Sequence, residues 1–417
     1  MPLALGDYTA ALRELLLPYI RDNFPKETIA LDQFKKNAGV NQINDEFIAP
    51  VWTSRHGGVV NLGVDSNSLI SSSGRTSSRA TVPVETVVAS FDITKLAMAA
   101  SSGAKLAVAS ALESQAKTLS SDYARHVNRQ IYGDQVGIVA QVSGSNSATN
   151  VELIYPNASL DDGRSIDWYG TINADISPTK YIAAGNHIGL GTGAAAVATV
   201  TAVNGGTSVT ITTGPAYAAN DSVYLVDGSG GGAGSSDFLG MRAALSSSTG
   251  TSTYAGLARS TNGWTPAFGS ASEALNMNRM YRSYTNAREY AQSNSDKYVV
   301  FVNKTLYIKY GDILTSMRRT VNEIDLVGGF KGLEFAAGGN VLGVYLDYDV
   351  PDGEVLTIDM DSWTICQVQE VDWLEDPNGG NLLRLQNTIS YQAVMTWFAN
   401  ILCLAPASNG RETRKTN

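Results

Sequence analysis

The sequence predicts an α+β protein built from several structural units. Three observations carry this prediction. A long segment, residues 102–131, places apolar side chains at helical spacing. A stretch rich in Thr, Val and Ile follows, from about residue 151 to 226, and short apolar strands then alternate with helical segments up to residue 361. The 417 residues also exceed one ordinary core, at roughly 150 residues per domain.

The composition indicates a protein whose surface is covered by something else. Charged residues make up 17% of the chain, below the ~25% usual for soluble domains, and glycine occurs 40 times. Copies of the same chain are the simplest cover for such a surface. The net charge of −9 argues against a protein that gains its affinity from phosphate groups, because such domains are usually basic.

The sequence shows no targeting or membrane signal. The N-terminus lacks the basic region and small-residue cleavage site of a signal peptide, and no apolar run approaches the ~18 residues needed to span a bilayer. Cys366 and Cys403 are the two cysteines. We therefore expect no disulfide framework, and a reducing cytoplasm as the site of synthesis.

Two elements are predicted before the long helix. Asp7 can cap a first helix with an apolar repeat formed by Tyr8, Leu12, Leu15, Leu16 and Tyr19. This helix can pack on its own domain or lie on a neighbouring subunit. Residues 57–64 and 80–91 are predicted as two strands of a long hairpin, joined by a Ser-rich tip that is too polar to bury.

Residues 102–131 are the strongest helix prediction of the chain. The apolar stripe consists of Val108, Leu112, Ala116, Leu119, Tyr123, Val127 and Ile131. The helix is expected to end at Tyr132-Gly133-Asp134, where the glycine can take the left-handed conformation of a C-terminal cap.

The rest of the chain alternates between strands and helices. Residues 151–226 are predicted as a small β-barrel or sandwich with a Gly-rich exit linker from Gly228. A helix is expected at 272–292, a strand at 298–302, and a helix at 307–319. Short strands should follow from Leu326 to Trp373, with a final strand pair from Leu382 to Leu404.

No catalytic, cofactor or metal site is predicted. Residues 189–194, GLGTGA, satisfy a dinucleotide-binding pattern, but an alternating β-branched stretch follows them where a helix is required. We therefore interpret them as a Gly-rich strand connection. The calcium-like triad Asp347, Asp349 and Asp352 is interrupted by Pro351 and lacks the bidentate glutamate, so we expect a turn with solvated carboxylates.

Other reactive side chains are equally scattered. The three histidines, His56, His126 and His187, are too far apart in sequence to indicate zinc, and no G-x-S-x-G elbow is present. Four arginines can form a basic patch for a subunit contact, or they can simply lie on solvated helix faces. They are Arg282, Arg288, Arg318 and Arg319.

In order along the chain, the sequence resembles the major capsid proteins of tailed bacteriophages, with the Hong Kong 97-type fold. The most specific segments are RHVNRQIYGD (125–134), TYAGLARSTNGWTP (253–266), DLVGGFKGLEF (325–335) and YDVPDG (348–353). The resemblance covers most of the chain except roughly residues 151–226.

The resemblance implies a domain organisation. It assigns residues 1–46 to an N-terminal arm, 47–93 to an extended loop hairpin, and 94–150 to a peripheral domain with the spine helix. It further assigns 151–230 to an inserted β domain, 231–362 to an axial domain, and 363–417 to a return to the peripheral domain with a C-terminal tail.

The resemblance also implies a function. The protein would be a structural, non-enzymatic capsid protein of a bacteriophage virion, made late and assembled in the host cytoplasm. Its copies would self-assemble into hexamers and pentamers and then into an icosahedral shell. The shell would enclose double-stranded DNA without sequence specificity, with portal, scaffolding and decoration proteins as further partners and no membrane. The residues expected at subunit contacts are Leu15, Leu16, Tyr19, Arg75, Arg79, Phe330 and Lys331.

Two other classes stay open at this stage. A bacterial encapsulin compartment shares the fold and would enclose cargo enzymes. A β-rich virion fibre or adhesin would explain the Ser, Gly and Thr content, but normally lacks a long amphipathic helix before the β segment.

Overall fold

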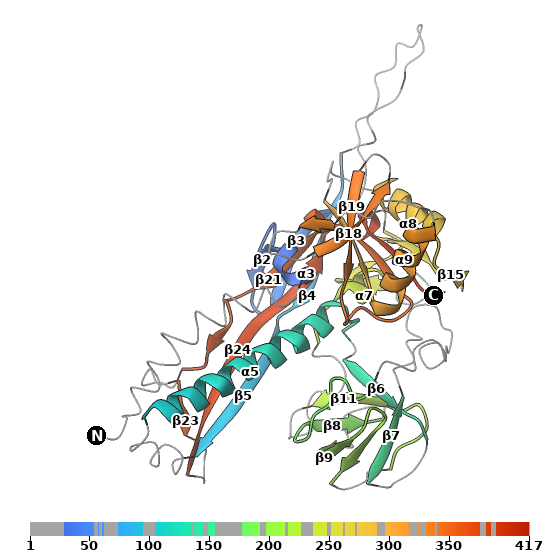
Figure 1. The fold of residues 1–417 in the computed structure, drawn as a ribbon. Coiled ribbons are helices and arrows are strands. Elements are labelled where there is room, and N and C mark those ends of the chain that lie inside the picture. The colour runs from blue at the N-terminus through green and yellow to red at the C-terminus, as the bar shows by residue number, and fades with distance from the viewer. Residues whose placement is uncertain are drawn as a thin grey trace.

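The computed structural model describes residues 29–53, 57, 61, 74–94, 105–135, 137–144, 149–154, 177–191, 197–212, 216–226, 237–247, 252–261, 263–271, 273–289, 297–316, 323–325, 331–337, 340–375, 381–384 and 389–416. Within these ranges, strands outnumber helices. The strands form a long sheet, a closed barrel, a seven-stranded sheet, a three-stranded hairpin sheet and two short strand pairs (Figure 1).

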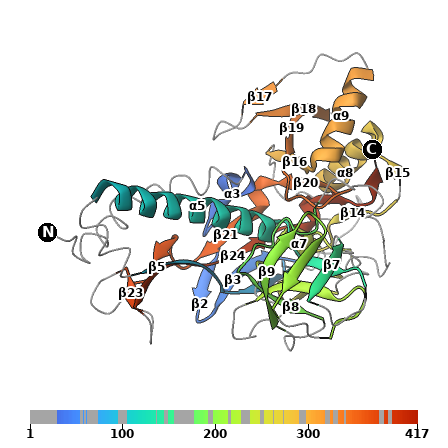
Figure 2. The same cartoon turned by 60° about the horizontal axis from the view of Figure 1, so that its bottom comes forward.

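A long helix and a long strand run side by side through the elongated part of the molecule. Helix α5, Lys105–Ile131, lies along strands β5, Glu85–Thr94, and β24, Ser390–Cys403, which pair antiparallel over ten residues (Figures 1 and 2). The other strands of this sheet also pair with β24 or its neighbour: β1 (Lys35–Lys36), β21 (Trp363–Gln367), β22 (Asp372–Trp373) and β23 (Leu383–Arg384).

The predicted apolar stripe of the spine helix faces the core. Ala116, Val127 and Ile131 are fully buried and Tyr123 is 3% exposed, while Leu119 packs partly buried against the same cluster. The hydroxyl of Tyr123 donates to the carbonyl of Val87 in β5 at 3.2 Å. For these five side chains the predicted apolar face is the buried one, whereas the side chains of Val108 and Leu112 lie outside the described part of the helix.

The spine helix ends where predicted, but the conformation of its C-terminal cap differs from the prediction. Gly133 does not have a positive φ, and its N–H donates to the Gln130 carbonyl at 3.0 Å. The left-handed positions are instead Gln135, with a φ of 73°, and Gly137, with a φ of 76°. Gly133 has another use, because its carbonyl accepts the N–H of Arg242 at 3.1 Å where the short helix α7, Met241–Ala244, begins.

A three-stranded hairpin sheet precedes the spine helix. It contains β2 (Asn41–Ile43), β3 (Glu46–Trp52) and β4 (Ser77–Pro83). The predicted strand at 57–64 lies almost wholly outside the described residues, and the hairpin strand at 46–52 was not predicted. The predicted strand at 80–91 is two strands, because the chain leaves the hairpin at Val84 and continues as β5 in the long sheet. Helix α3, Ile29–Gln33, contacts α5.

The β-rich stretch forms a closed six-stranded barrel. Its strands are β6 (Ile138–Val142), β7 (Asn150–Ile154), β8 (His187–Leu190), β9 (Val197–Asn204), β10 (Ser208–Ile211) and β11 (Ser222–Val226). The first strand, β6, lies upstream of the predicted start at residue 151. The barrel has a hydrophobic cluster of its own, which includes Val139, Leu153, Ile188, Val209 and Val223.

The axial part is an α/β unit around a seven-stranded sheet. The strand order is β14 (Ala267–Gly269), β25 (Gly410–Glu412), β20 (Val355–Asp359), β16 (Tyr298–Val302), β19 (Asn340–Leu346), β18 (Lys331–Ala337) and β17 (Glu323–Asp325). Helices α8, Met277–Glu289, and α9, Lys304–Ser316, lie beside it (Figures 1 and 2).

Short elements complete the described chain. They are the strand pair β12 (Thr253–Tyr254) and β13 (Leu257–Ala258), the pair β15 (Glu273–Ala274) and β26 (Lys415–Thr416), and the 3-10 turns η4 (Met360–Ser362) and η5 (Pro406–Ser408). Because β25 and β26 pair with axial strands, the end of the described chain is built into this unit.

Both cysteines are free and buried, as expected without a disulfide framework. Cys366 in β21 and Cys403 in β24 belong to the same hydrophobic cluster. Burial raises the pKa of each thiol to about 12. Thiols this basic are almost entirely protonated at neutral pH and hence poor nucleophiles.

Candidate functional site

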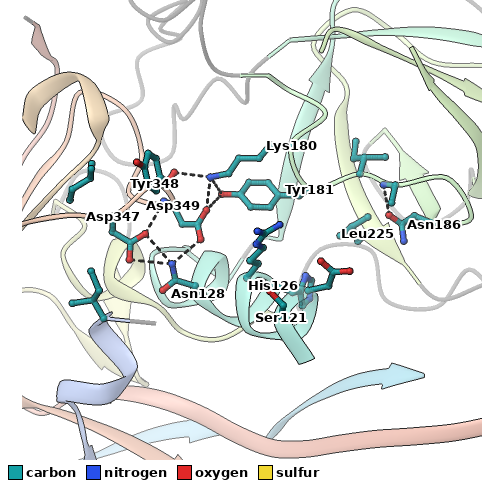
Figure 3. Close-up of a pocket in the computed structure, with 16 residues that line it drawn as sticks. Ser121, His126, Asn128, Lys180, Tyr181, Asn186, Leu225, Asp347, Tyr348 and Asp349 are labelled. Atoms are coloured by element: carbon teal, nitrogen blue, oxygen red, sulfur yellow. Dashed lines mark hydrogen bonds and ion pairs between the residues drawn. The ribbon is translucent and has the colours of Figure 1, made fainter. Parts of the chain in front are cut away.

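The most elaborate polar cluster in the described chain lies where three units meet. Helix α5, the segment before β8, and the turn after β19 each contribute side chains to it (Figure 3). The turn after β19 carries two of the three aspartates that the sequence analysis weighed as a calcium loop. The contacts around them decide what the cluster can do.

Asp347 is buried against the spine helix. Asn128 donates its Nδ2 to Asp347 Oδ1 at 3.0 Å and to Asp349 Oδ2 at 2.8 Å, and the Tyr132 hydroxyl donates to Asp347 Oδ2 at 3.0 Å. Burial raises the pKa of Asp347 to about 6, and the negative charge of Asp349 acts in the same direction. The hydrogen bonds from Asp349 N–H, Tyr132 and Asn128 oppose this shift but do not cancel it.

The barrel reaches this cluster through two neighbouring side chains. Lys180 Nζ contacts Asp349 Oδ1 at 2.5 Å and donates to the Tyr348 carbonyl at 2.7 Å. The Tyr181 hydroxyl donates to the same Asp349 oxygen at 2.7 Å. Figure 3 shows both side chains directed from the barrel side toward the aspartate turn. The Lys180–Asp349 pair is thus the charged link between the inserted barrel and the axial unit.

A cleft of about 890 Å³ opens beside this link. Its walls come from all three units: Ser121, Asp122, Arg125 and His126 of the spine helix, Ile182, Ala183, Asn186 and Leu225 of the barrel, and Leu346 to Asp349 of the axial unit. Tyr348 stands at the edge of the cleft with 66% of its surface exposed.

The expectation of solvated carboxylates at this turn was wrong. Asp347 is 6% exposed and Asp352 is 2% exposed, and Asn303 Nδ2 donates to Asp352 Oδ1. Local spacing of aspartates does not reveal that the turn is covered by a helix whose Asn128 lies 219 positions before Asp347 in the chain. Among the described residues, no group of three or more His, Cys, Asp and Glu side chains could hold a metal ion.

A second charged cluster lies at the base of the barrel. Arg129 Nη1 pairs with Asp237 Oδ2 at 2.8 Å, joining the spine helix to the segment that returns from the barrel. Burial raises the pKa of Glu85 to about 7; a hydrogen bond from Gln135 opposes this, and the charge of Asp237 adds to it. Burial lowers the pKa of His126 to about 4, and the positive charge of Arg129 lowers it further.

The Gly-rich segment 189–194 is not a nucleotide site. Gly189 and Leu190 lie in β8, which pairs antiparallel with β9 from Val197, so strands of the barrel stand on both sides of the segment; residues 192–194 themselves lie outside the described residues. A dinucleotide site needs a helix after the glycines to present its N-terminus to the pyrophosphate. The interpretation as a strand connection is confirmed.

The axial unit contains an unusual buried ion pair. Arg411 in β25 is 1% exposed and Glu354 is 3% exposed, and the guanidinium donates Nε to Oε2 at 3.0 Å and Nη2 to Oε1 at 2.5 Å. Arg242 of α7 places its Nε 3.4 Å from the same Glu354 oxygen. Nothing in the sequence marks these three residues, which are far apart in the chain.

The residues predicted at subunit contacts are only partly described. Arg75 and Arg79 are exposed on the hairpin, and the Arg75 guanidinium lies 4.9 Å from the ring centroid of Trp52. Lys331 is the first residue of β18. The others, Leu15, Leu16, Tyr19 and Phe330, lie outside the described residues. The described members therefore come from the hairpin and from β18, and their role in subunit contacts stays a prediction.

The candidate basic patch has a similar outcome. Arg282 is exposed on α8, whereas Arg288 lies with its guanidinium 5.9 Å from the ring centroid of Tyr298. Arg318 and Arg319 lie outside the described residues.

None of the helices in the described part of the chain is long and apolar enough to cross a bilayer.

No family model and no curated protein matches the sequence. Solved structures match the fold. A chain of the cyanophage A-1(L) capsid asymmetric unit is 12% identical with a TM-score of 0.51, and the match covers 94% of this chain and 93% of that chain. A chain from Gordonia phage Cozz is 12% identical with a TM-score of 0.41, covering 93% and 86%.

An encapsulin complex from Synechococcus elongatus is 8% identical with a TM-score of 0.28, and the match covers 38% of this chain and 57% of that chain. Of these three matches, the cyanophage chain is the one with a TM-score above 0.5. That match, over nearly the full length of both chains, confirms the predicted α+β fold of the Hong Kong 97 type.

Proposed function

We propose that this chain is the major capsid protein of a tailed bacteriophage and that its copies assemble into an icosahedral shell around double-stranded DNA. The observation that carries the proposal is the full-length likeness of fold to the cyanophage A-1(L) capsid chain. The role is structural and not enzymatic, with the protein resident in the virion after assembly in the host cytoplasm.

The hairpin sheet supports a role in contacts between copies. Trp52 in β3 and Ile43 in β2 are each 51% exposed, although both are large apolar side chains. Arg75 lies over the Trp52 ring. Tryptophan and arginine are enriched in the centres of protein interfaces, because they combine a large contact area with directed polar groups. A second copy that covers this sheet would bury both apolar side chains.

The predicted contact residues belong to the same proposal. Leu15, Leu16 and Tyr19 would join the arm to a neighbour, Arg75 and Arg79 the hairpin, and Phe330 and Lys331 the axial units around each ring. Contacts of one kind repeated around a ring close it into a hexamer or pentamer, and a second kind joins the rings.

The charge of the chain suits a container for DNA. A net charge of −9 disfavours tight, sequence-independent binding to phosphates, so packaged DNA would stay separate from the wall. Portal, scaffolding and decoration proteins are the further partners of this proposal. A shell that holds protein cargo instead of DNA is the encapsulin alternative.

Sedimentation of the purified protein tests assembly and the hairpin contact together. We expect the unchanged chain to sediment as closed particles, and Trp52→Ser to remain folded but to form at least ~10-fold fewer particles, since hot-spot truncations typically cost 2 kcal/mol or more. Ile308→Ser, which changes a side chain of 57% exposure on α9, is the matched control and should assemble normally.

Three outcomes would count against the proposal. A folded wild-type chain that stays monomeric at high concentration would contradict shell formation. Normal assembly of Trp52→Ser would remove the hairpin from the contacts. Particles purified from infected cells that enclose protein and no nuclease-protected DNA would favour a cargo compartment.

A further inference from the structure

In the described part of the chain, side chains join the barrel to the other units at its base and at the aspartate turn, and Arg129 contacts both Asp237 at the base and the ring of Tyr181. The apolar residues of the barrel form a cluster of their own, distinct from those of the long sheet and the axial unit. The side chains that link it to the other units are polar or aromatic. Its orientation therefore depends on a small number of directed contacts and not on a shared hydrophobic core.

The first attachment is at the base. The chain enters the barrel through Gln135 and Gly137, both with left-handed backbone conformations, and Asp237 lies on the returning segment. The Arg129–Asp237 ion pair of 2.8 Å ties that segment to the end of the spine helix, with both side chains largely buried. A Cβ on Gly137 would lie 3.5 Å from the Asp237 carboxylate, so the entering and returning segments are close together.

The second attachment is the contact of Lys180 and Tyr181 with Asp349. Lys180 is 33% exposed and Asp349 is 9% exposed at the side chain, so the ion pair is only partly screened by water. Asp349 also accepts from Asn128 at 2.8 Å, which fixes the carboxylate between the spine helix and the barrel. Beside it lies the open cleft of about 890 Å³, which leaves the barrel and the axial turn apart on that side.

We propose that Lys180 and Tyr181 form a latch that sets the orientation of the barrel, and that the barrel pivots about its base when this latch is broken. The base keeps the barrel tethered, because the chain passes through it twice and Arg129 holds Asp237. The latch fixes the remaining rotation through one carboxylate. The proposal concerns a single subunit and does not depend on the proposed shell function.

The local charges make the latch sensitive to loss of the lysine. Asp347 and Asp349 share one amide donor, Asn128, and Lys180 supplies the positive charge at Asp349. Without Lys180 the two carboxylates repel each other, and Asp349 is drawn toward solvent. We therefore expect Lys180→Met to release the barrel more than Asp349→Asn does, since the asparagine can still accept from Tyr181.

Distances between spin labels on the barrel and the axial unit test the latch. Labels are attached to cysteines introduced at Thr207, in the exposed turn between β9 and β10, and at Ile308 on α9. The buried native thiols leave the introduced cysteines as the reactive ones. Full-length labelled protein is mixed with excess unlabelled protein, so that only distances within one subunit are measured.

We expect one narrow distance in the unchanged latch and a broad or second distance in Lys180→Met. A charge-assisted hydrogen bond of this kind shifts the ratio of latched to unlatched forms on the order of tenfold. Lys180→Arg should keep the narrow distance, because it keeps the positive charge. In the double variant Lys180→Met with Asp349→Asn, the distance distribution should be no broader than in Lys180→Met alone. Lys304→Met, an exposed lysine on α9, is the charge-matched control and should have no effect.

An unchanged narrow distance in both Lys180→Met and Asp349→Asn would overturn the latch. If Lys180→Met unfolds the barrel, as circular dichroism and protease resistance would show, Tyr181→Phe provides the milder test, because it keeps the ring and the Lys180–Asp349 ion pair and removes only the hydroxyl, with its contacts to Asp349 at 2.7 Å and Lys180 at 3.1 Å. A folded Tyr181→Phe with the wild-type distance distribution, together with the same result for Asp349→Asn, would equally contradict the proposal.

Discussion

Replacing Arg411 by methionine should destabilise the axial unit substantially. Arg411 binds Glu354 through two hydrogen bonds of 3.0 Å and 2.5 Å, and both side chains are almost fully buried. At an effective dielectric constant of about 20, two unit charges 4 Å apart attract each other by about 4 kcal/mol. Removal of one partner of a buried pair typically costs ~3–5 kcal/mol, because the other charge remains buried.

The neighbouring arginine decides where in this range each variant falls. Arg242 Nε lies 3.4 Å from Glu354 Oε1, so in Arg411→Met the carboxylate keeps one cationic neighbour. We expect a cost of about 3 kcal/mol. Glu354→Met leaves two buried guanidinium groups near each other, and we expect the upper end, about 5 kcal/mol. The double variant Arg411→Met with Glu354→Met removes both charges of the pair. Its cost should therefore be less than the sum of the two single costs.

Hydrogen exchange of the β20 and β25 amides measures the opening free energy of this unit directly. It avoids a single global unfolding transition, which a chain with several cores does not have to show. The control is Lys36→Met, which breaks the exposed Lys36–Glu370 pair and should change exchange by no more than ~1 kcal/mol. Equal effects of Arg411→Met and Lys36→Met, or an additive double variant, would refute the reasoning.

Further predictions concern Glu85, two glycines and the two native thiols. Glu85→Gln should stabilise the protein by about 1 kcal/mol above pH 7 and have little effect below pH 5 in urea unfolding, because the raised folded-state pKa of about 7 makes ionisation of Glu85 increasingly unfavourable as pH rises from 4.5. The same stabilisation at both pH values would contradict it. Gly240→Ala should destabilise by about 1–3 kcal/mol, since a Cβ there would overlap the carbonyl oxygens of Gln130 and Ile131. Gly311→Ala, with open space in helix α9, should instead stabilise by about 0.5–1 kcal/mol. A fall in melting temperature for Gly240→Ala and a rise for Gly311→Ala would confirm the two glycine predictions. The two native thiols should react with a thiol reagent only after denaturation, and rapid reaction of the folded protein would show that their burial is wrong.

The sequence predicts elements well where one local pattern decides them. The spine helix ends at Ile131 as predicted, because a 3.6-residue apolar repeat runs to that point. The strand at Tyr298–Val302 has the predicted bounds, since a short run of buried β-branched and aromatic residues is typical of a central strand. By contrast, helix α9 begins at Lys304, before the predicted start at 307.

Elements fixed by distant partners were predicted poorly. Strand β3 contains Pro50, and its exposed and buried side chains alternate only once it is paired in the hairpin. Its sequence alone therefore gave no strand prediction. Strand β6 depends on pairing with β11, which lies on the far side of the barrel sequence. The chain passes from the hairpin to the long sheet at Val84, directly after Pro83, which the strand prediction for residues 80–91 did not treat as a break.

The polar sites were the least predictable part. The latch joins Lys180 to Asp349, and the buried ion pair joins Glu354 to Arg411, so neither has a sequence spacing to read. The aspartate turn was weighed as a calcium loop and predicted to be solvated, whereas its burial depends on Asn128 and Tyr132 of the spine helix. Acidic clusters in a sequence reveal their chemistry only when the elements that cover them are known.

Cryo-electron microscopy of the purified, assembled protein tests the central claim most directly. The account predicts closed icosahedral shells of defined diameter, with each subunit in the fold described here and the β2–β3–β4 sheet covered by an adjacent subunit. Burial of Trp52 at that contact is the specific feature to look for in the density. Folded subunits that form no closed particles, or shells in which this sheet remains uncovered, would contradict the account.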